Sequence, residues 1–272
     1  MTPDTAPATP VPAELKPRLD FALDAASEAG RLILGYFRQA GLPVELKADR
    51  SPVTAADRGA ETLIRDALAR SFPDDGFLGE ESGETESRNG YRWIVDPLDG
   101  TKSFVHGVPL FGTLIGVEFG GRMVAGVCRL PVLNEVVYAA LGRGAWWQIG
   151  GDPPRPARVS GVSRLSEALQ CFTTVTGFTT VGRPEVFETL CRETRLSRGW
   201  GDCYGHVLVA TGRADLIVEP QMNPWDAAAL VPILEEAGGH YLDWSGRASI
   251  TSGCGLSVNG ALREAVLEIV RR

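Results

Sequence analysis

The chain has 272 residues, of which 44% are hydrophobic, and its formal net charge is −7. This length suits one large domain or two closely associated ones with a sizeable core. The acidic balance argues against nucleic acid or an anionic membrane as a main partner, and no apolar run approaches the roughly 18 residues of a membrane span.

The N-terminal segment 1–13 is rich in Pro, Thr and Ala and lacks the basic and apolar regions of a signal peptide. We therefore expect a disordered tail on a cytoplasmic protein. The cysteines are odd in number and show no CxxC spacing, which favours reduced, buried thiols over a zinc site or a disulfide framework. They are Cys128, Cys171, Cys191, Cys203 and Cys254.

Two helices are predicted before the first acidic motif. Apolar residues at helical spacing indicate a long helix over 14–39, which Gly41-Leu42-Pro43 ends. A short strand over 44–48 and a turn lead to a second helix over 54–71, with Asp57 in its first turn. An acid there complements the helix dipole, so Asp57 gains a functional interpretation only if other acids converge on it.

The stretch after residue 92 carries the strongest chemical signal. Trp93-Ile94-Val95 predicts a short buried strand that ends at Asp96 and Asp99. Unpaired buried charge is costly, so either cations neutralise these carboxylates or they face water. Pro97 stiffens the turn between them, and Gly100-Thr101 offers N–H groups that suit a phosphate. This pattern predicts a hard-cation site beside an anion site.

The remaining elements suggest two halves. Strands over 111–118, 123–130, 135–140 and 145–148 form an antiparallel meander, and the Gly/Pro-rich run 150–156 is a candidate boundary. We divide the chain into an N-terminal α+β half, 14–150, with the metal-binding motifs, and a C-terminal α/β half, 151–272, that completes the site. The C-terminal half is expected to hold strands over 169–174, 216–218 and 256–258 and helices over 184–193, 204–211, 224–237 and 261–272, with 196–200 left open.

Six acids stand at the ends of these elements, and ligation by oxygen alone suits Mg²⁺ or Mn²⁺. The sequence has no GxSxG, no P-loop and no zinc-type histidine spacing, which leaves metal-assisted phosphoester hydrolysis. One cation lowers the pKa of an attacking water, and a second stabilises the leaving oxygen. Thr101 is placed to orient the water, and the Gly100 and Thr101 amides to hold the phosphate. The acids are Asp57, Glu80, Asp96, Asp99, Glu219 and Asp226.

Three separated motifs carry a family resemblance. Trp93-Ile94-Val95-Asp96-Pro97-Leu98-Asp99-Gly100-Thr101 resembles the central motif of the inositol monophosphatase-like family. Gly79-Glu80-Glu81-Ser82 is similar to its upstream acidic motif, and Trp225-Asp226-Ala227-Ala228-Ala229 with Glu236-Ala237-Gly238-Gly239 to its C-terminal motif. The resemblance implies a Mg²⁺-dependent phosphomonoesterase, commonly a homodimer. It also implies an α/β layered αβαβα sandwich of the inositol monophosphatase/fructose-1,6-bisphosphatase type.

The resemblance also implies a set of two or three metal ions. One metal would use Glu80, Asp96 and the carbonyl of Leu98. A second would use Asp96, Asp99 and Asp226.

The resemblance implies further roles for residues near the metals. Asp57 and Thr101 would polarise the attacking water, and Glu80 would help to hold a third, weaker ion. Lys47 matches a basic position near the metals, although a lone lysine is equally compatible with the surface.

Within the family, the closest resemblance is to the histidinol-phosphate phosphatase branch. It is carried by Thr101-Lys102-Ser103-Phe104, by 107–115, by 198–205 and by 219–226. This implies hydrolysis of L-histidinol phosphate to L-histidinol and phosphate in histidine biosynthesis. Asp202, Glu219 and Asp226 would contact the cationic substrate. Trp200 or Tyr204 would offer an aromatic face, or serve in the core or a dimer contact.

Three alternatives stay open. The first is an inositol-1-phosphate or broad sugar-phosphate phosphatase. The second is a 3′-phosphoadenosine 5′-phosphate phosphatase. The third is a non-catalytic scaffold for protein or RNA. The complete set of acids argues against the scaffold, and the net charge of −7 argues against RNA.

Overall fold

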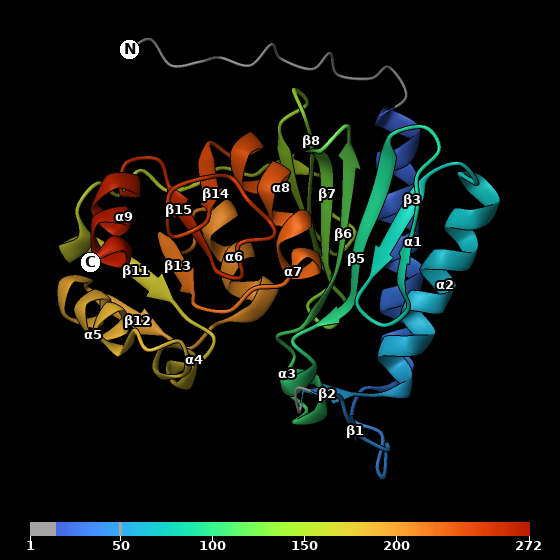
Figure 1. The fold of residues 1–272 in the computed structure, drawn as a ribbon, viewed down its shortest axis with the longest axis horizontal. Coiled ribbons are helices and arrows are strands. Elements are labelled where there is room, and N and C mark those ends of the chain that lie inside the picture. The colour runs from blue at the N-terminus through green and yellow to red at the C-terminus, as the bar shows by residue number, and fades with distance from the viewer. Residues whose placement is uncertain (1–14, 49–50) are drawn as a thin grey trace.

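Two large β-sheets alternate with three layers of helices in the computed structural model, which describes residues 15–48 and 51–272 (Figure 1). This is the expected αβαβα sandwich. The tail expected over residues 1–13 lies outside the described residues. No helix in the described ranges is long and apolar enough to cross a membrane.

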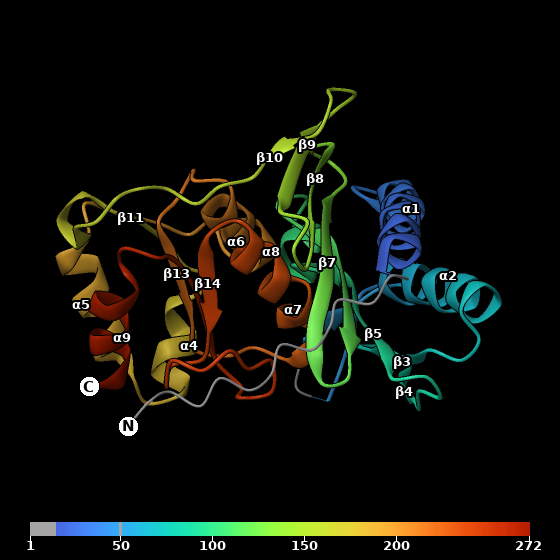
Figure 2. The same cartoon turned by 90° about the horizontal axis from the view of Figure 1, so that it is seen from above.

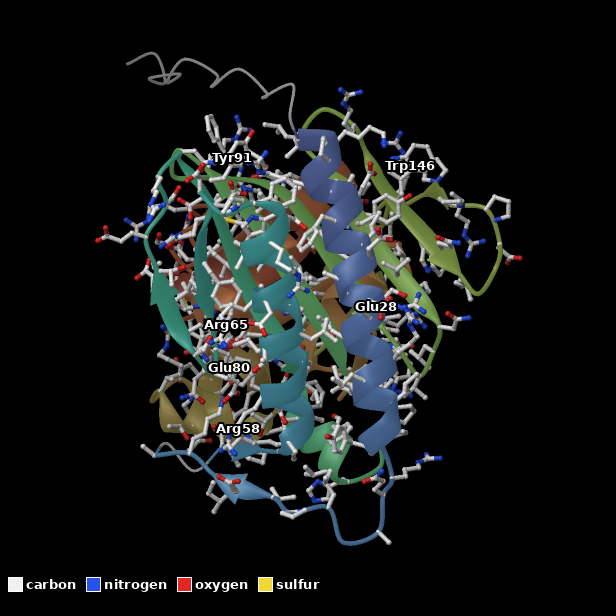
Figure 3. All side chains as sticks on the ribbon, turned by 90° about the vertical axis from the view of Figure 1, so that its right-hand side faces the viewer. Glu28, Arg58, Arg65, Glu80, Tyr91 and Trp146 are labelled. Atoms are coloured by element: carbon white, nitrogen blue, oxygen red, sulfur yellow. The ribbon has the colours of Figure 1, made fainter. Side chains whose placement is uncertain are left out.

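The first sheet has eight strands in the order β10-β9-β8-β7-β6-β5-β3-β4, and only β3 and β5 pair in parallel. Two long helices, α1 (Leu15–Tyr36) and α2 (Ala55–Ser71), cover its outer face (Figure 3). A separate pair, β1 (Glu45–Leu46) and β2 (Pro52–Val53), lies near the start of α2. The strands of the first sheet are β3 (Gly76–Gly79), β4 (Gly83–Thr85), β5 (Tyr91–Asp99), β6 (Gly112–Phe119), β7 (Arg122–Leu130), β8 (Glu135–Ala140), β9 (Ala145–Ile149) and β10 (Arg155–Pro156).

The second sheet has five strands in the order β12-β11-β13-β15-β14. Helices α6 (Asp202–Ala210), α7 (Pro224–Ala228) and α8 (Leu230–Glu236) fill the layer between the sheets, as the view from above shows (Figure 2). Helices α4 (Val175–Thr180), α5 (Pro184–Glu193) and α9 (Arg263–Arg271) cover the far face. The strands are β11 (Leu169–Cys171), β12 (Leu196–Arg198), β13 (Leu216–Glu219), β14 (Gly239–Leu242) and β15 (Gly255–Asn259), and two short helices, α3 (Thr101–Val105) and η1 (Leu165–Glu167), lie in connections.

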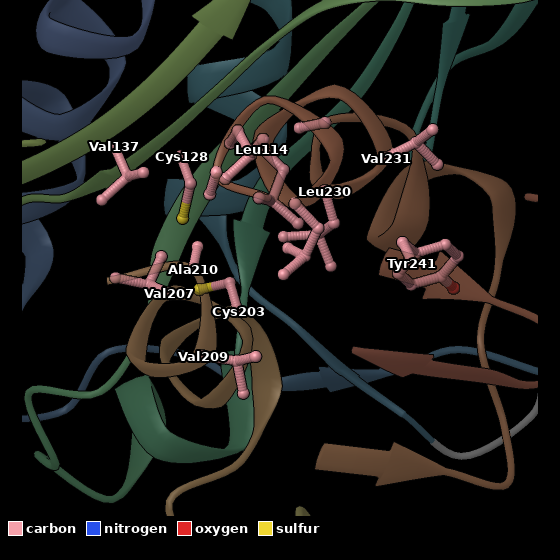
Figure 4. Close-up of a cluster of buried hydrophobic side chains, with 14 of the residues drawn as sticks. Leu114, Cys128, Val137, Cys203, Val207, Val209, Ala210, Leu230, Val231 and Tyr241 are labelled. Carbon is pink, nitrogen blue, oxygen red and sulfur yellow. The ribbon is translucent and has the colours of Figure 1, made fainter. Parts of the chain in front are cut away.

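Three apolar cores among the described residues hold the five layers together, and one of them covers both faces of the middle helices. In the middle layer, Leu114 and Cys128 of the first sheet lie close to Cys203 and Val207 of α6 (Figure 4). Helix α1 buries mainly alanines, which lets it lie close to the sheet. The central helices are therefore clamped between two sheets, and the loops at their ends are held in place.

The structure corrects three expectations from the sequence. The helix expected over 224–237 is two helices that meet at Ala229, because Pro232 has no N–H to donate to the carbonyl of Ala228. The strand expected to stop at Val95 continues to Asp99 as β5, with a register shift after Asp96. Strand β14 and helix α4 are not predicted from the sequence, because each is short. Strand β14 begins at a glycine, and α4 begins in a threonine-rich segment.

A strand that the sequence did not predict lies in the expected boundary segment, 150–156. Strand β10 pairs with β9, so the chain leaves the first sheet only after Pro156. The division into halves at residue 150 stays a prediction.

Two glycines let α7 approach the first sheet. Gly116 of β6 and Gly126 of β7 are paired neighbours. A Cβ on Gly126 would lie 2.1 Å from the carbonyl oxygen of Ala229, and one on Gly116 would lie 2.7 Å from Cβ of Ala228. No side chain fits between these two strands and the C-terminal end of α7. The first turn of the same short helix carries Asp226.

Gly126→Ala is therefore expected to lower the free energy of unfolding by about 1 to 3 kcal/mol through overpacking. Urea unfolding measures this change. Gly161→Ala is the matched control, because a Cβ there meets nothing within 4 Å, and we expect a change within about 0.5 kcal/mol. Equal losses for the two variants would contradict the close approach.

Candidate active site

Three carboxylates from two distant segments meet beside the end of β5. Asp96 and Asp99 lie on either side of its register shift, and Asp226 stands in the first turn of α7. One oxygen from each of the three lies within 4.8 Å of the other two. A cluster of oxygen ligands of this kind suits a hard divalent cation.

Backbone amides fix each of these acids. The N–H of Leu98 donates to Asp96 Oδ1 at 2.9 Å, and that of Cys203 donates to Asp99 Oδ2 at 2.5 Å. The N–H of Asn223 donates to Asp226 Oδ2 at 2.7 Å. The cluster is thus held in position by α6, α7 and the turn after Asp96.

The electrostatics of the cluster are unfavourable without a counter-charge. Burial, followed by repulsion from Glu80, Asp99 and Asp226, raises the pKa of Asp96 well above its ordinary value. Burial, followed by repulsion from Asp202 and Asp226, does the same to the pKa of Asp99. A bound cation would relieve both effects, so the chemistry of the donor set fits a divalent metal ion.

Glu80 lies in the same pocket but in an ion pair. Lys47 Nζ lies 2.7 Å from Glu80 Oε1 and 2.5 Å from Glu81 Oε1. Burial opposes the charge of Lys47, but its hydrogen bonds to the two glutamates raise its pKa above the usual value. Glu80 lies at the same end of α2 as Arg58 (Figure 3). It lines the pocket and is hydrogen-bonded to Asp96, but it is not one of the three clustered acids.

Asp57 performs two tasks at once. Its Oδ2 accepts from the N–H and hydroxyl of Thr54, which completes a capping box at the start of α2. Its Oδ1 lies 3.1 Å from Thr101 Oγ1, which also lies 3.0 Å from the carbonyl of Leu98. The capping interpretation and the convergence with Thr101 are both correct.

A second pocket adjoins the cluster. A space of about 180 Å³ is lined by Glu80, Asp96 and residues 98–102, and one of about 70 Å³ by Thr173, His206 and Glu219. Asp99, Asp202 and Asp226 line both spaces. A larger pocket of about 380 Å³ beside Arg122 and residues 248–251 contains none of these acids.

The small pocket is acidic. Burial raises the pKa of Glu219 to about 8 and that of Asp202 to about 6. Thr173 links them, because its hydroxyl donates to Glu219 at 2.5 Å and accepts from the N–H of Asp202 at 2.8 Å. A cationic group entering the pocket would favour the charged form of both carboxyls.

The structure thus brings Glu80, Asp96, Asp99, Glu219 and Asp226 to two adjoining spaces, and Asp57 reaches them through Thr101. Sequence reasoning missed Thr173, which no motif marks, and His206, a lone histidine in an apolar helix. Trp200 and Tyr204 do not line either of the two spaces; Tyr204 packs on the middle core and Trp200 is 38% exposed. An aromatic contact to the substrate from either ring stays a prediction.

The structure is a five-layer sandwich with a carboxylate cluster and an adjoining small pocket. The model of the inositol monophosphatase family matches residues 14–272, and the chain belongs to this family. The named relatives are phosphomonoesterases, and the chain is an enzyme of this class.

Relatives with known names agree. A histidinol-phosphatase from Chlorobaculum parvum is 47% identical over 249 residues, which cover 91% of this chain and 94% of that protein. One from Mycobacterium tuberculosis is 39% identical and covers 92% and 96%. The crystal structure of the extragenic suppressor protein SuhB from Bartonella henselae has a TM-score of 0.86 at 31% identity and covers 94% of this chain and 99% of that one.

Asp99→Asn is expected to stabilise the metal-free protein by about 1 to 3 kcal/mol, because it removes one of the repelling charges. The gain should grow as the pH rises. The pKa of Asp99 is raised in the folded protein, so its ionisation at higher pH costs the wild type stability. Urea unfolding with a chelator at pH 6 and pH 8 measures this.

Asp75→Asn is the matched control and should change stability in the opposite direction. Asp75 is a buried acid whose carboxylate lies 2.8 and 2.7 Å from two nitrogens of Arg18. Breaking a buried pair of this kind costs about 3 to 5 kcal/mol. Destabilisation by both variants would contradict the repulsion that we describe at the cluster.

Proposed function

We propose that this chain is a Mg²⁺-dependent histidinol-phosphate phosphatase that converts L-histidinol phosphate and water to L-histidinol and phosphate. One observation carries the proposal: the pocket that adjoins the carboxylate cluster is itself lined by acids, Asp202 and Glu219. Histidinol bears an ammonium group, and carboxylates are its natural partners. The histidinol-phosphatases among the relatives support the same choice.

The metal ligands are proposed as the sequence suggested them. Asp96, Asp99 and Asp226 hold the cations, with Glu80 and the carbonyl of Leu98 completing the set. Mn²⁺ is an alternative to Mg²⁺ for these oxygen ligands. Bound there, divalent cations supply an acidified water and neutralise charge on the phosphate.

Thr101 orients the nucleophile in this proposal. A hydroxyl has one proton, and donating it to Asp57 leaves the lone pairs of Thr101 Oγ1 to accept a hydrogen bond from the attacking water. Gly100 adopts a φ of 84°, which turns the chain sharply into α3. The amides of Gly100 and Thr101 then face the phosphate and hold it.

The alcohol end of the substrate lies on the other side of Asp226. Its ammonium pairs with Asp202 and Glu219, which favours their charged forms. The active enzyme is proposed to be a cytoplasmic homodimer, in keeping with a biosynthetic role.

Thr101→Val should lower kcat about 10²- to 10³-fold with little change in KM, since it removes the group that positions the water but no substrate contact. Thr101→Ser keeps the hydroxyl and should retain most of the activity. Steady-state phosphate release measures both. Equal activity of the valine and serine variants would refute this role.

A phosphate-release panel tests the substrate. It compares histidinol phosphate, inositol 1-phosphate, fructose 1,6-bisphosphate and 3′-phosphoadenosine 5′-phosphate, each with Mg²⁺ and with a chelator. We expect the highest kcat/KM for histidinol phosphate and no turnover without the metal. A much higher value for another ester would sink the substrate assignment, and activity in the chelator would sink the metal assignment.

A further inference from the structure

His206 is a buried histidine that the proposed reaction leaves without a role. It lies on α6, one turn after Asp202, and lines the small pocket together with Glu219 and Met222. Its residue surface is only 1% exposed. A polar group buried this deeply normally has hydrogen-bond partners for its polar atoms.

Only one nitrogen of the ring is paired. Nδ1 lies 2.7 Å from the Ser257 hydroxyl of β15, whereas Nε2 has no hydrogen-bond partner among the described residues. The Ser257 hydroxyl forms no other hydrogen bond within the same part of the chain. The Ser257 hydroxyl and Nδ1 each have a partner if the hydroxyl donates to Nδ1. The proton of the neutral ring is then on Nε2.

The ring is a neutral donor in an acidic pocket. Burial lowers the pKa of His206 to about 3, so it carries no charge at neutral pH. The pocket is thus lined by Asp202 and Glu219, whose carboxyls accept hydrogen bonds, and by His206, whose buried Nε2–H lacks an acceptor. A ligand that satisfies all three groups carries an ammonium and, several bonds away, an uncharged acceptor.

The size of the pocket limits that acceptor. Its volume of about 70 Å³ corresponds to roughly two waters at about 30 Å³ each. One five-membered ring fills such a space. A ring nitrogen with a free lone pair, as in a neutral imidazole, is an acceptor of matching size and chemistry.

We infer that His206 donates a hydrogen bond from Nε2 to the ring nitrogen of the substrate, and so determines which amino-alcohol phosphates the enzyme prefers. The inference rests on the proposed function and assigns a specificity residue to the same site. Ser257 acts through His206 and is a positioning residue.

Two phosphate esters separate the ring contact from the rest of the substrate. Histidinol phosphate has the ring nitrogen, and thienylalaninol phosphate has the same aminopropyl phosphate and a five-membered ring without nitrogen. The specificity ratio is kcat/KM for the first ester divided by that for the second. It isolates what the ring nitrogen contributes.

Two amide variants separate the ring nitrogens of His206. His206→Asn places an amide near the position of Nδ1 and keeps a partner for Ser257, but it does not reach the position of Nε2. His206→Gln places an amide N–H near Nε2. We expect the asparagine variant to lose about 10- to 100-fold in the specificity ratio, mainly through KM for histidinol phosphate, and the glutamine variant to retain most of it.

Two further variants complete the design. His240→Asn is the matched control, because His240 lies on β14 outside both spaces, and its specificity ratio should equal that of the wild type. Ser257→Ala frees Nδ1 and should lower the ratio as well, which provides a second test if the asparagine variant fails to fold. Thermal unfolding monitors the fold of every variant.

The outcomes are distinct. Equal losses on the two esters in the asparagine, glutamine and alanine variants would show a purely structural histidine and overturn the inference, while the proposed function would stand. A wild-type enzyme that does not hydrolyse histidinol phosphate would overturn the proposed function, and this inference with it.

Discussion

Repulsion among buried carboxylates is the constraint on which the site depends. Asp96, Asp99 and Asp226 are brought within reach of one another in a pocket where burial limits the screening of their charges by water. The fold therefore carries an electrostatic cost that a divalent cation would offset. The same geometry would therefore attract a metal ion and destabilise the metal-free protein.

The layered fold supplies the rigidity that this geometry needs. The middle helices are packed between two sheets, and Gly116 and Gly126 admit the end of α7 against the first sheet. Through α7 this close approach fixes Asp226, and through α6 the Cys203 amide fixes Asp99. The acidic pocket shares Asp99, Asp202 and Asp226 with the space beside Gly100 and Thr101, so the proposed substrate would be able to occupy both.

Much of this was visible in the sequence, and the failures have physical causes. The central motif and the acids at the ends of apolar runs identified the cluster, because buried strands rarely end in carboxylates for stability. The sequence predicts a strand that stops at Val95, because Pro97 and the acids break the apolar pattern. The register shift after Asp96 nevertheless keeps the rest of the strand in the sheet. The sequence predicts a single helix after Asn223, because the apolar periodicity continues across Pro232. Thr173 and His206 cannot be recognised from the sequence because their hydrogen bonds are to tertiary neighbours, Glu219 and Ser257, that are 46 and 51 residues away.

The three clustered carboxylates are proposed to hold divalent cations. A crystal of the wild-type protein soaked in Mn²⁺ tests this most directly through its anomalous scattering. We predict anomalous peaks bridging the carboxylates of Asp96, Asp99 and Asp226, and none in a crystal of Asp99→Asn at the position that Asp99 shares. A crystal without such peaks, or with peaks only elsewhere on the protein, would contradict the account.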